Sequence, residues 1–242
     1  MGRGRGPDRH VPQPAAAVGR HLNVAINLHD FEALARARLS EPAAANLAGG
    51  AADELTLAAN AQAWQRLQLL PRVLRPLAGG HTRSTLLGRP LAQPVLVAPV
   101  AHQALFHPDA ERASALAAAM QGAGFVLSLQ ASTRLEDVAA LVRDEPGRGP
   151  LWLQLHWLHD RGFLQTLVQR AEASGFDALV LTVDAPTQGA RDRERRAGFA
   201  LPPGVRMVNL DGLAPRPAPP LAIGGSALFD GLLPPAAPWD DV

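Results

Sequence analysis

Four short apolar segments recur at regular intervals along the chain, beginning near residues 94, 124, 151 and 178. Each segment is followed by a longer stretch in which apolar residues return with helical spacing. Strands that alternate with helices at this interval form βαβ units, and such units place their strands parallel in one sheet. The segments are apolar at consecutive positions, as strands buried on both faces must be. The sequence therefore predicts an α/β fold.

Helices are expected between these strands and also ahead of them. Thr133 followed three residues later by Glu136 matches a capping box, and Gly175 suits the position just beyond a helix end. In the N-terminal part, Asn27 or Asp30 can cap a helix, and Pro71 should end another. The expected helices span residues 27–39, 51–70, 108–122, 133–144 and 160–174.

Two architectures fit this repeat, an open doubly wound sheet and a (β/α)8 barrel of the TIM type. No G-x-G-x-x-G motif follows the first strand, which weakens the dinucleotide-binding version of the open sheet. A barrel of this type takes about 250 residues. Because the first strand begins only near residue 94, about the first four βα units of a barrel are present.

Polar side chains and a Pro-containing turn stand at the carboxyl ends of the strands, where they would share one rim of the sheet. That rim is where barrel enzymes bind their ligands. A single polar residue in such a place is most simply structural, but the set together favours a ligand site. The set comprises Pro99, Val100, Ala101, Ser128, Gln130, Gln154, His156, Thr182 and Asp184.

The remaining segments divide the chain. Residues 1–24 are rich in Gly, Pro and Arg without periodicity and are expected to be a disordered tail. Residues 25–242 form the domain, within which residues 202–238 are expected to be a long Pro- and Gly-rich loop.

Composition removes several classes of function. The chain has no Cys, so disulfides and thiolate chemistry are excluded, and His102 and His107 lack a carboxylate at metal-ligand spacing. A net charge of +1 gives no reason to expect a nucleic-acid partner. No apolar run approaches the roughly 20 residues of a membrane span, and the start lacks a signal-peptide core. We therefore expect no membrane span and a cytoplasmic location.

Several motifs, in this order and spacing, resemble the FMN-dependent α-hydroxy-acid dehydrogenases, the family of glycolate oxidase, lactate oxidase, mandelate dehydrogenase and the flavin domain of flavocytochrome b2. The similarity runs from about Ile26 to the end of the chain. The motifs are GAADELTL (50–57), LPRVL (70–74), APVA (98–101), HPDAE (107–111), QLH (154–156), LTVDAP (181–186), GAR (189–191), FALPP (199–203) and PWDDV (238–242).

The resemblance implies FMN on the rim of a (β/α)8 barrel, oxidation of a small L-2-hydroxy acid to the 2-oxo acid, and often a homotetramer. By position, the backbone of Pro99, Val100 and Ala101 would lie near the flavin ring. Side chains that would hydrogen-bond the ring are Ser128, Gln154 and Thr182. Arg191 matches an arginine that binds the substrate carboxylate, and Asp184 matches the carboxylate that orients the catalytic histidine.

The chain also departs from the family pattern. Asn46 and His156 stand where the family has substrate-binding tyrosines, and Gln130 replaces a common tryptophan. The chain has no Lys, whereas the family places one beside the flavin. The family's catalytic histidine, second substrate arginine and FMN phosphate site would follow residue 242. We therefore expect residues 1–242 alone to be inactive, and an inactive half-barrel or an interaction module is the alternative interpretation.

The three pocket departures predict that the complete barrel is a poor glycolate oxidase. Loss of a well-placed hydrogen bond to a charged group costs about 1.5–3 kcal/mol, or roughly ten- to a hundredfold in affinity. Steady-state oxidation of glycolate by a completed barrel should show the loss. Restoring tyrosine with Asn46→Tyr and His156→Tyr should recover glycolate turnover, and undiminished turnover without these changes would contradict the prediction.

Overall fold

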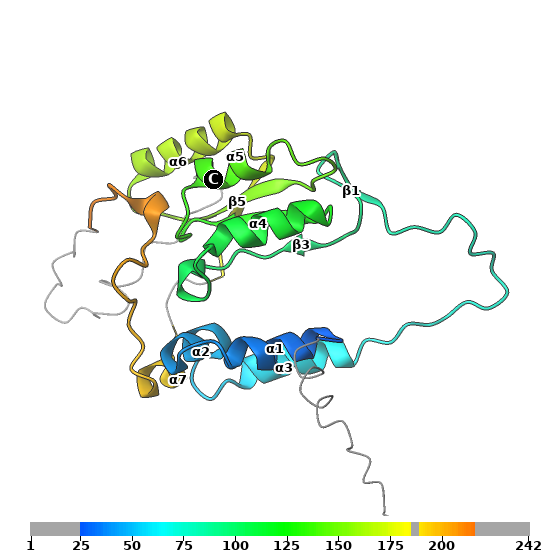
Figure 1. Cartoon of the computed structure of the whole chain (residues 1–242), viewed down its shortest axis with the longest axis horizontal. Helices are drawn as coiled ribbons and strands as arrows, with labels where there is room; N and C mark the ends of the chain where they lie inside the picture. The colour runs from blue at the N-terminus through cyan, green and yellow to red at the C-terminus, as the bar shows by residue number, and fades with distance from the viewer. Residues whose placement is uncertain (1–24, 185–188, 216–242) are drawn as a thin grey trace, which may run out of the picture.

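The computed structural model describes residues 25–184 and 189–215 (Figure 1). Its helices are α1 (Leu28–Arg36), α2 (Glu41–Ala48), α3 (Leu55–Gln65), α4 (Ala110–Met120), α5 (Leu135–Val142), α6 (Arg161–Ser174) and α7 (Asp192–Arg196). Its strands are β1 (Ser84–Leu86), β2 (Arg89–Leu91), β3 (Leu96–Val97), β4 (Gly124–Ser128), β5 (Leu151–His156) and β6 (Ala178–Thr182). Two 3-10 helices are η1 (Gln103–Leu105) and η2 (Val208–Leu210). Within these two ranges, no helix combines the length and apolar character that crossing a membrane requires.

The central sheet has the strand order β3-β4-β5-β6, and all neighbouring strands are parallel. This confirms the prediction of an α/β fold made from successive βα units. Strand β3 is shorter than expected, since only Leu96 and Val97 join the ladder beside β4. The two outer strands, β3 and β6, each have only one neighbour among the described strands. The sheet therefore has two parallel edges open.

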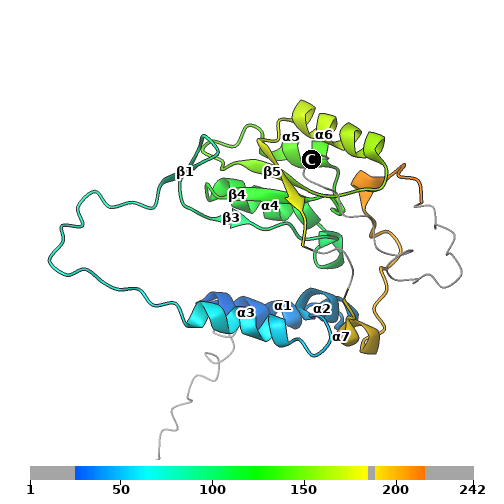
Figure 2. The same ribbon diagram turned by 180° about the vertical axis from the view of Figure 1, so that it is seen from behind.

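The hydrophobic core lies on one face of this sheet, beneath α4, α5 and α6 (Figure 1). Leu127 of β4 and Leu153 of β5 point into it and are fully buried, together with Leu135 and Leu167 of the helices. Because side chains alternate along a strand, their neighbours Ser128 and Gln154 point to the opposite face. Figure 2 shows this opposite face from behind, with none of α4–α6 over it. The polar residues thus share the face that the helices leave open.

The N-terminal helices differ from the sequence prediction. Asn27 does cap α1 and forms a capping box with Asp30, but the helix ends at Arg36 rather than near Leu39. Helix α2 was not expected. The predicted helix over 51–70 is α3 alone, which ends at Gln65, so Pro71 is not its terminator. No residue of α3 is buried, and a helix without a packed face gains no tertiary support for further turns.

The expected capping box at Thr133 and Glu136 is wrong. The Thr133 hydroxyl instead donates to the buried Glu111 carboxylate at 2.7 Å, and Arg134 is the N-cap of α5 without a side-chain cap bond. The amide of Leu135 donates to Asn209 Oδ1 at 2.9 Å, so a residue distant in sequence caps this helix. A tertiary contact thus replaced the local one. By contrast, Gly175 ends α6 in the left-handed conformation, as predicted, and Asp160, expected as the first residue of this helix, is its N-cap.

Two further features were not predicted or fall partly outside the described residues. The β1–β2 hairpin turns at Leu87 and Gly88, both with positive φ, as a two-residue hairpin turn of type I′ requires.

The expected loop over 202–238 is described only as far as residue 215. Within this described part, η2 interrupts the loop at residues 208–210, and its residue Asn209 is fully buried. Residues 1–24, the expected tail, lie outside the described ranges, as does the motif at 238–242.

Asn209 should contribute strongly to stability because it bonds two buried backbone groups, the Leu135 amide and the Thr133 carbonyl. Each group left without a partner costs about 1–3 kcal/mol, so we expect Asn209→Ala to lower the free energy of unfolding by about 2–4 kcal/mol. Urea unfolding followed by circular dichroism measures this. The matched control is Asn60→Ala on the exposed side of α3, which should change little. Equal losses in both variants would contradict the assignment.

Candidate active site

The rim residues of the three long strands form a continuous row across the sheet. Ser128 and Gln154 are paired in the β4–β5 register, and the Ser128 hydroxyl donates to Gln154 Oε1 at 3.4 Å. Gln154 Nε2 donates to the Thr182 hydroxyl oxygen on β6 at 2.8 Å. The sequence prediction that these side chains converge is confirmed. We call Ser128, Gln154 and Thr182 the rim row.

Two hydrogen-bond donors of the rim row have no partner among the described residues. Gln154 is almost fully buried, and of its two amide hydrogens only the one toward Thr182 has a partner among the described residues. The Thr182 hydroxyl accepts this bond and retains its own hydrogen as a donor. The row therefore offers an amide and a hydroxyl donor on the open face, side by side. This arrangement fits the alternating nitrogen and oxygen atoms along the edge of a flavin ring.

The turn after β3 lies beside the rim row. Pro99 and Val100 are exposed, so their backbone is accessible, and Ala101 leads into His102. The His102 amide donates to the Gln130 carbonyl at 3.1 Å, which ties this turn to the end of β4. The three residues predicted to face a flavin thus occupy the same edge of the sheet as the rim row.

A buried carboxylate, whose role the sequence did not predict, shapes this turn. Glu111 of α4 is fully buried and accepts hydrogen bonds from the amides of Gln103 and Ser132 at 3.2 and 2.9 Å. Its other oxygen accepts from Thr133. One side chain therefore joins the loop after β3 to the loop after β4. The sequence signals for this role were its place at the end of the HPDAE motif (107–111) and in an alanine-rich helix.

His102 is the electrostatically unusual residue of the rim. Its backbone is left-handed, with φ of 54°, and its Nδ1 atom is buried without a hydrogen-bond partner among the described residues. Burial lowers the pKa of His102 below its ordinary value of 6.5, and the nearby Glu111 carboxylate offsets part of this shift. The imidazole is therefore held neutral near pH 7.

Arg191 and Asn46 form a second group, between α2 and the segment that leads into α7. Arg191 donates from Nε to Glu194 and from its terminal nitrogen to the Asn46 carbonyl, the latter at 2.8 Å. The Asn46 amide donates to the same Glu194 oxygen at 3.0 Å. Glu194, which the sequence analysis missed, thus fixes both predicted substrate residues. The terminal nitrogen not bonded to Asn46 has no partner among the described residues.

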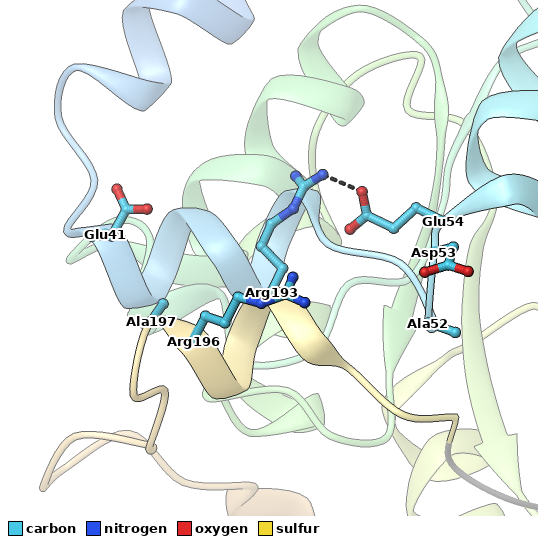
Figure 3. A pocket seen from close by; sticks show the side chains of 7 residues that line it. All are labelled: Glu41, Ala52, Asp53, Glu54, Arg193, Arg196 and Ala197. Atoms are coloured by element: carbon cyan, nitrogen blue, oxygen red, sulfur yellow. Dashed lines mark hydrogen bonds and ion pairs between the residues drawn. The ribbon is translucent and has the colours of Figure 1, made fainter.

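A charged cavity adjoins this second group (Figure 3). It encloses about 460 Å³ and is lined by Glu41, Asp53, Glu54, Arg193, Arg196 and two alanines. Arg193 pairs with Glu54 across it and also bonds the Ala48 carbonyl at the end of α2. The hydrogen bond from the Gly50 amide lowers the pKa of Glu54, and Arg193 adds to this effect. These contacts hold α7 against the end of α2 and the start of α3, and none involves the rim row.

The remaining predicted residues are not brought into a bonded arrangement. His156 ends β5 and is half-buried, opposite Thr182 in the register, while Asp184 lies exposed two residues beyond β6. Neither side chain has a hydrogen-bond partner among the described residues. Residues 185–188, which connect Asp184 to the Arg191 group, lie outside the described ranges. The structure thus presents a rim row and an Arg191 group as two separate assemblies.

Comparison with known proteins places the chain, with both groups of residues, in one family. Residues 35–242 match the family model of FMN-dependent dehydrogenases. The L-lactate oxidase of Roseobacter sp. (strain GAI101) is 48% identical over 217 residues, which cover 90% of this chain and 57% of that protein. The 4-hydroxymandelate oxidase of Amycolatopsis orientalis is 42% identical over 77% of this chain and 50% of its own length.

The solved structures agree. The crystal structure of mandelate oxidase with (S)-2-phenylpropionate superposes with a TM-score of 0.73 at 41% identity, covering 78% of this chain and 55% of that one. The chain thus spans about half to three fifths of the length of the curated and solved relatives it matches.

The half-buried His102, whose Nδ1 atom is buried, predicts a pH dependence of stability. Because its pKa is lowered in the folded state, the unfolded chain binds the proton more readily as the pH falls. The stabilisation by neutral His102 is present above pH 6.5 and is lost as the pH falls through the lower folded pKa. Between pH 7.5 and 5, the free energy of unfolding, measured with urea, should therefore fall less steeply with falling pH in His102→Asn than in the native chain. Asparagine tolerates the left-handed backbone at this position. Exposed His81→Gln is the control, and equal slopes in the native chain and His102→Asn would contradict this prediction.

Proposed function

Because the chain belongs to the FMN-dependent dehydrogenase family, we propose that it supplies the FMN-ring side of a barrel enzyme that oxidises a small L-2-hydroxy acid. The family fold is the (β/α)8 barrel, so β3–β6 form four of its eight strands rather than an open doubly wound sheet. The observation that carries the proposal is the rim row, whose spare donors face the open side of the sheet at the strand ends.

Within this proposal, Ser128, Gln154 and Thr182 would hold the edge of the flavin ring, and the turn at Pro99–Ala101 would lie against its face. When bound, FMN supplies the acceptor for the two electrons that leave the hydroxyl-bearing carbon of the substrate. Gln154 suits its role because it is locked from both sides by hydrogen bonds, which fixes the direction of its remaining amide hydrogen.

The substrate end of the site would be built on Arg191. A guanidinium presents a planar fork that matches a carboxylate, and Glu194 together with the Asn46 carbonyl fixes this fork. Asn46 would contribute less than a tyrosine to carboxylate binding because Glu194 already takes one of its amide hydrogens. Relatives that share these segments are named for lactate, 4-hydroxymandelate and glycolate oxidation, which supports a small 2-hydroxy acid as the substrate class.

The described residues do not supply a base for removal of the substrate's hydroxyl proton. Removal of the hydroxyl proton requires a base within hydrogen-bond reach, and such a base contributes about 10²–10⁴-fold in rate. Asp184 would orient an imidazole and stabilise its cation, as carboxylates do in other histidine-dependent sites. His156 has no hydrogen bond to Asp184. We propose that the catalytic base lies outside the described residues, and the alternative is a catalytically inactive half-barrel.

Flavin binding tests the cofactor part directly. Titration of residues 1–242 with FMN, followed by flavin fluorescence and absorbance, should show weak binding that does not survive gel filtration. Gln154→Leu should weaken it roughly two- to tenfold, the value of one hydrogen bond, whereas exposed Gln68→Leu should leave it unchanged. A titration in which Gln154→Leu binds as well as the native chain would contradict the placement of the ring.

Turnover tests the catalytic part. We expect residues 1–242 with added FMN to give no measurable oxidation of L-lactate, glycolate or mandelate, because none of the described residues places a base beside Asp184. Activity should appear only when polypeptide carrying the remaining strands is supplied. Turnover by residues 1–242 alone that is lost in His156→Ala would overturn this and identify His156 as the base.

A further inference from the structure

His102 combines two unusual features directly after the turn that follows β3. Its backbone is left-handed, with φ of 54° and ψ of 43°, a conformation that few residues other than glycine adopt. Its Nδ1 atom is buried and has no hydrogen-bond partner among the described residues, although the residue as a whole is only half-buried. Strained backbone and unpaired buried polar atoms both gather at functional positions, so their coincidence in one residue points to a role.

The position of His102 links it to the candidate site. It directly follows the turn at Pro99–Ala101, and its amide donates to the Gln130 carbonyl beyond β4 at 3.1 Å. The next residue, Gln103, donates its amide to the Glu111 carboxylate at 3.2 Å. A rotation of the His102 backbone would therefore move the turn on one side and the Glu111 contact on the other.

Glu111 is the charged group that a protonated His102 would meet. Burial lowers the pKa of His102, and the Glu111 carboxylate is the one charge among the described residues that counteracts this shift. Glu111 accepts two hydrogen bonds through Oε1 and one, from Thr133, through Oε2. Oε2 therefore retains capacity for a further donor.

Other ionisable side chains in the loops around His102 have partners of their own. His107, in the same loop, lies 3.8 Å from Asp109. Arg134, in the loop after β4, lies 3.6 Å from Glu136. A proton gained by His102 is therefore best compensated by the buried carboxylate of α4.

Neutral and protonated His102 require different surroundings. Neutral imidazole carries one N–H group, whereas the imidazolium carries two and a charge, and a buried charge without an acceptor is costly. The structure leaves Nδ1 without an acceptor among the described residues, so it fits the neutral form. In the protonated form, Nδ1–H would gain a charge-assisted hydrogen bond by turning toward Glu111 Oε2. Because no hydrogen bond joins the two side chains in the structure, His102 must leave its present conformation to make one.

We propose that His102 is a positioning residue for the turn at Pro99–Ala101: neutral His102 holds the turn in its observed conformation, and protonation draws the imidazole to Glu111 and displaces the turn. If the turn lies against a flavin ring, acid then weakens flavin binding, and this consequence alone rests on the proposed function. The displacement itself depends only on the contacts of His102 and Glu111.

NMR spectroscopy of residues 1–242 without flavin tests the displacement. The histidine ring signals give the pH midpoint at which His102 titrates, and N–H residual dipolar couplings give the directions of backbone bonds independently of charge. Between pH 7.5 and 5, the couplings of Val100, Ala101 and Gln103 should change with the midpoint of His102. Couplings that stay constant over this range, whether or not the ring titrates, would overturn the proposal.

Matched variants separate the imidazole from other titrating groups. His102→Asn keeps a residue that tolerates left-handed backbone and has no side-chain proton to gain, so its couplings should not change with pH. His81→Gln, at an exposed histidine, should behave like the native chain. Changes that persist in His102→Asn would assign the movement to another group and would equally overturn the proposal.

Flavin binding is measured separately, with riboflavin as the probe because it lacks the phosphate of FMN, which itself titrates near pH 6. Fluorescence titration of the native chain should give an affinity that is constant from pH 7.5 to 6.5. The affinity should then fall by up to about tenfold per pH unit below the folded pKa of His102, the limit for one proton. In His102→Asn it should not depend on pH. Riboflavin binding that is absent or independent of pH, while the couplings change, would contradict the proposed placement of the ring and leave the role of His102 in the turn supported.

Discussion

The burial of one face of the parallel sheet against α4, α5 and α6 is the interaction on which the rest of the structure depends. Leu127, Leu153, Leu135 and Leu167 leave water completely in this contact, and each fully buried leucine contributes roughly 1.5–3 kcal/mol. Because side chains alternate along a strand, turning the leucines toward the helices turns Ser128 and Gln154 toward the other face. The same pattern that builds the core therefore aims the candidate ligand-binding groups.

Two buried polar side chains then set the shape of the rim. Glu111 gathers amides from the loops that follow β3 and β4, and Asn209 caps α5 from a segment more than 70 residues away in sequence. A buried polar group left without a hydrogen bond destabilises the fold by more than the bond itself contributes to stability. The geometry that makes these bonds is therefore strongly favoured. Glu111 thus holds the loop after β3 against the loop after β4, and Asn209 holds the start of α5.

The candidate site is divided between two parts that the described residues hold by different forces. The rim row belongs to the sheet, whereas Arg191 is the N-cap of α7. Carbonyl contacts attach this segment to α2, and the Arg193–Glu54 ion pair attaches it to the start of α3. A reaction at the rim requires the two parts to meet around one substrate.

Sequence periodicity by itself determined the βα repeat, the parallel order of β3–β6, and the convergence of Ser128, Gln154 and Thr182, because alternation along strands is a local property. The family resemblance led us to expect Arg191, Asn46 and His156 in one substrate site, and the structure brings Arg191 and Asn46 into hydrogen-bond contact. Only the tertiary structure decided that Glu111 displaces the Thr133 cap, that Asn209 caps α5, and that Glu194 takes up the Asn46 amide. Each of these is a contact between residues far apart in the chain. Their energies depend on burial, which no local pattern encodes.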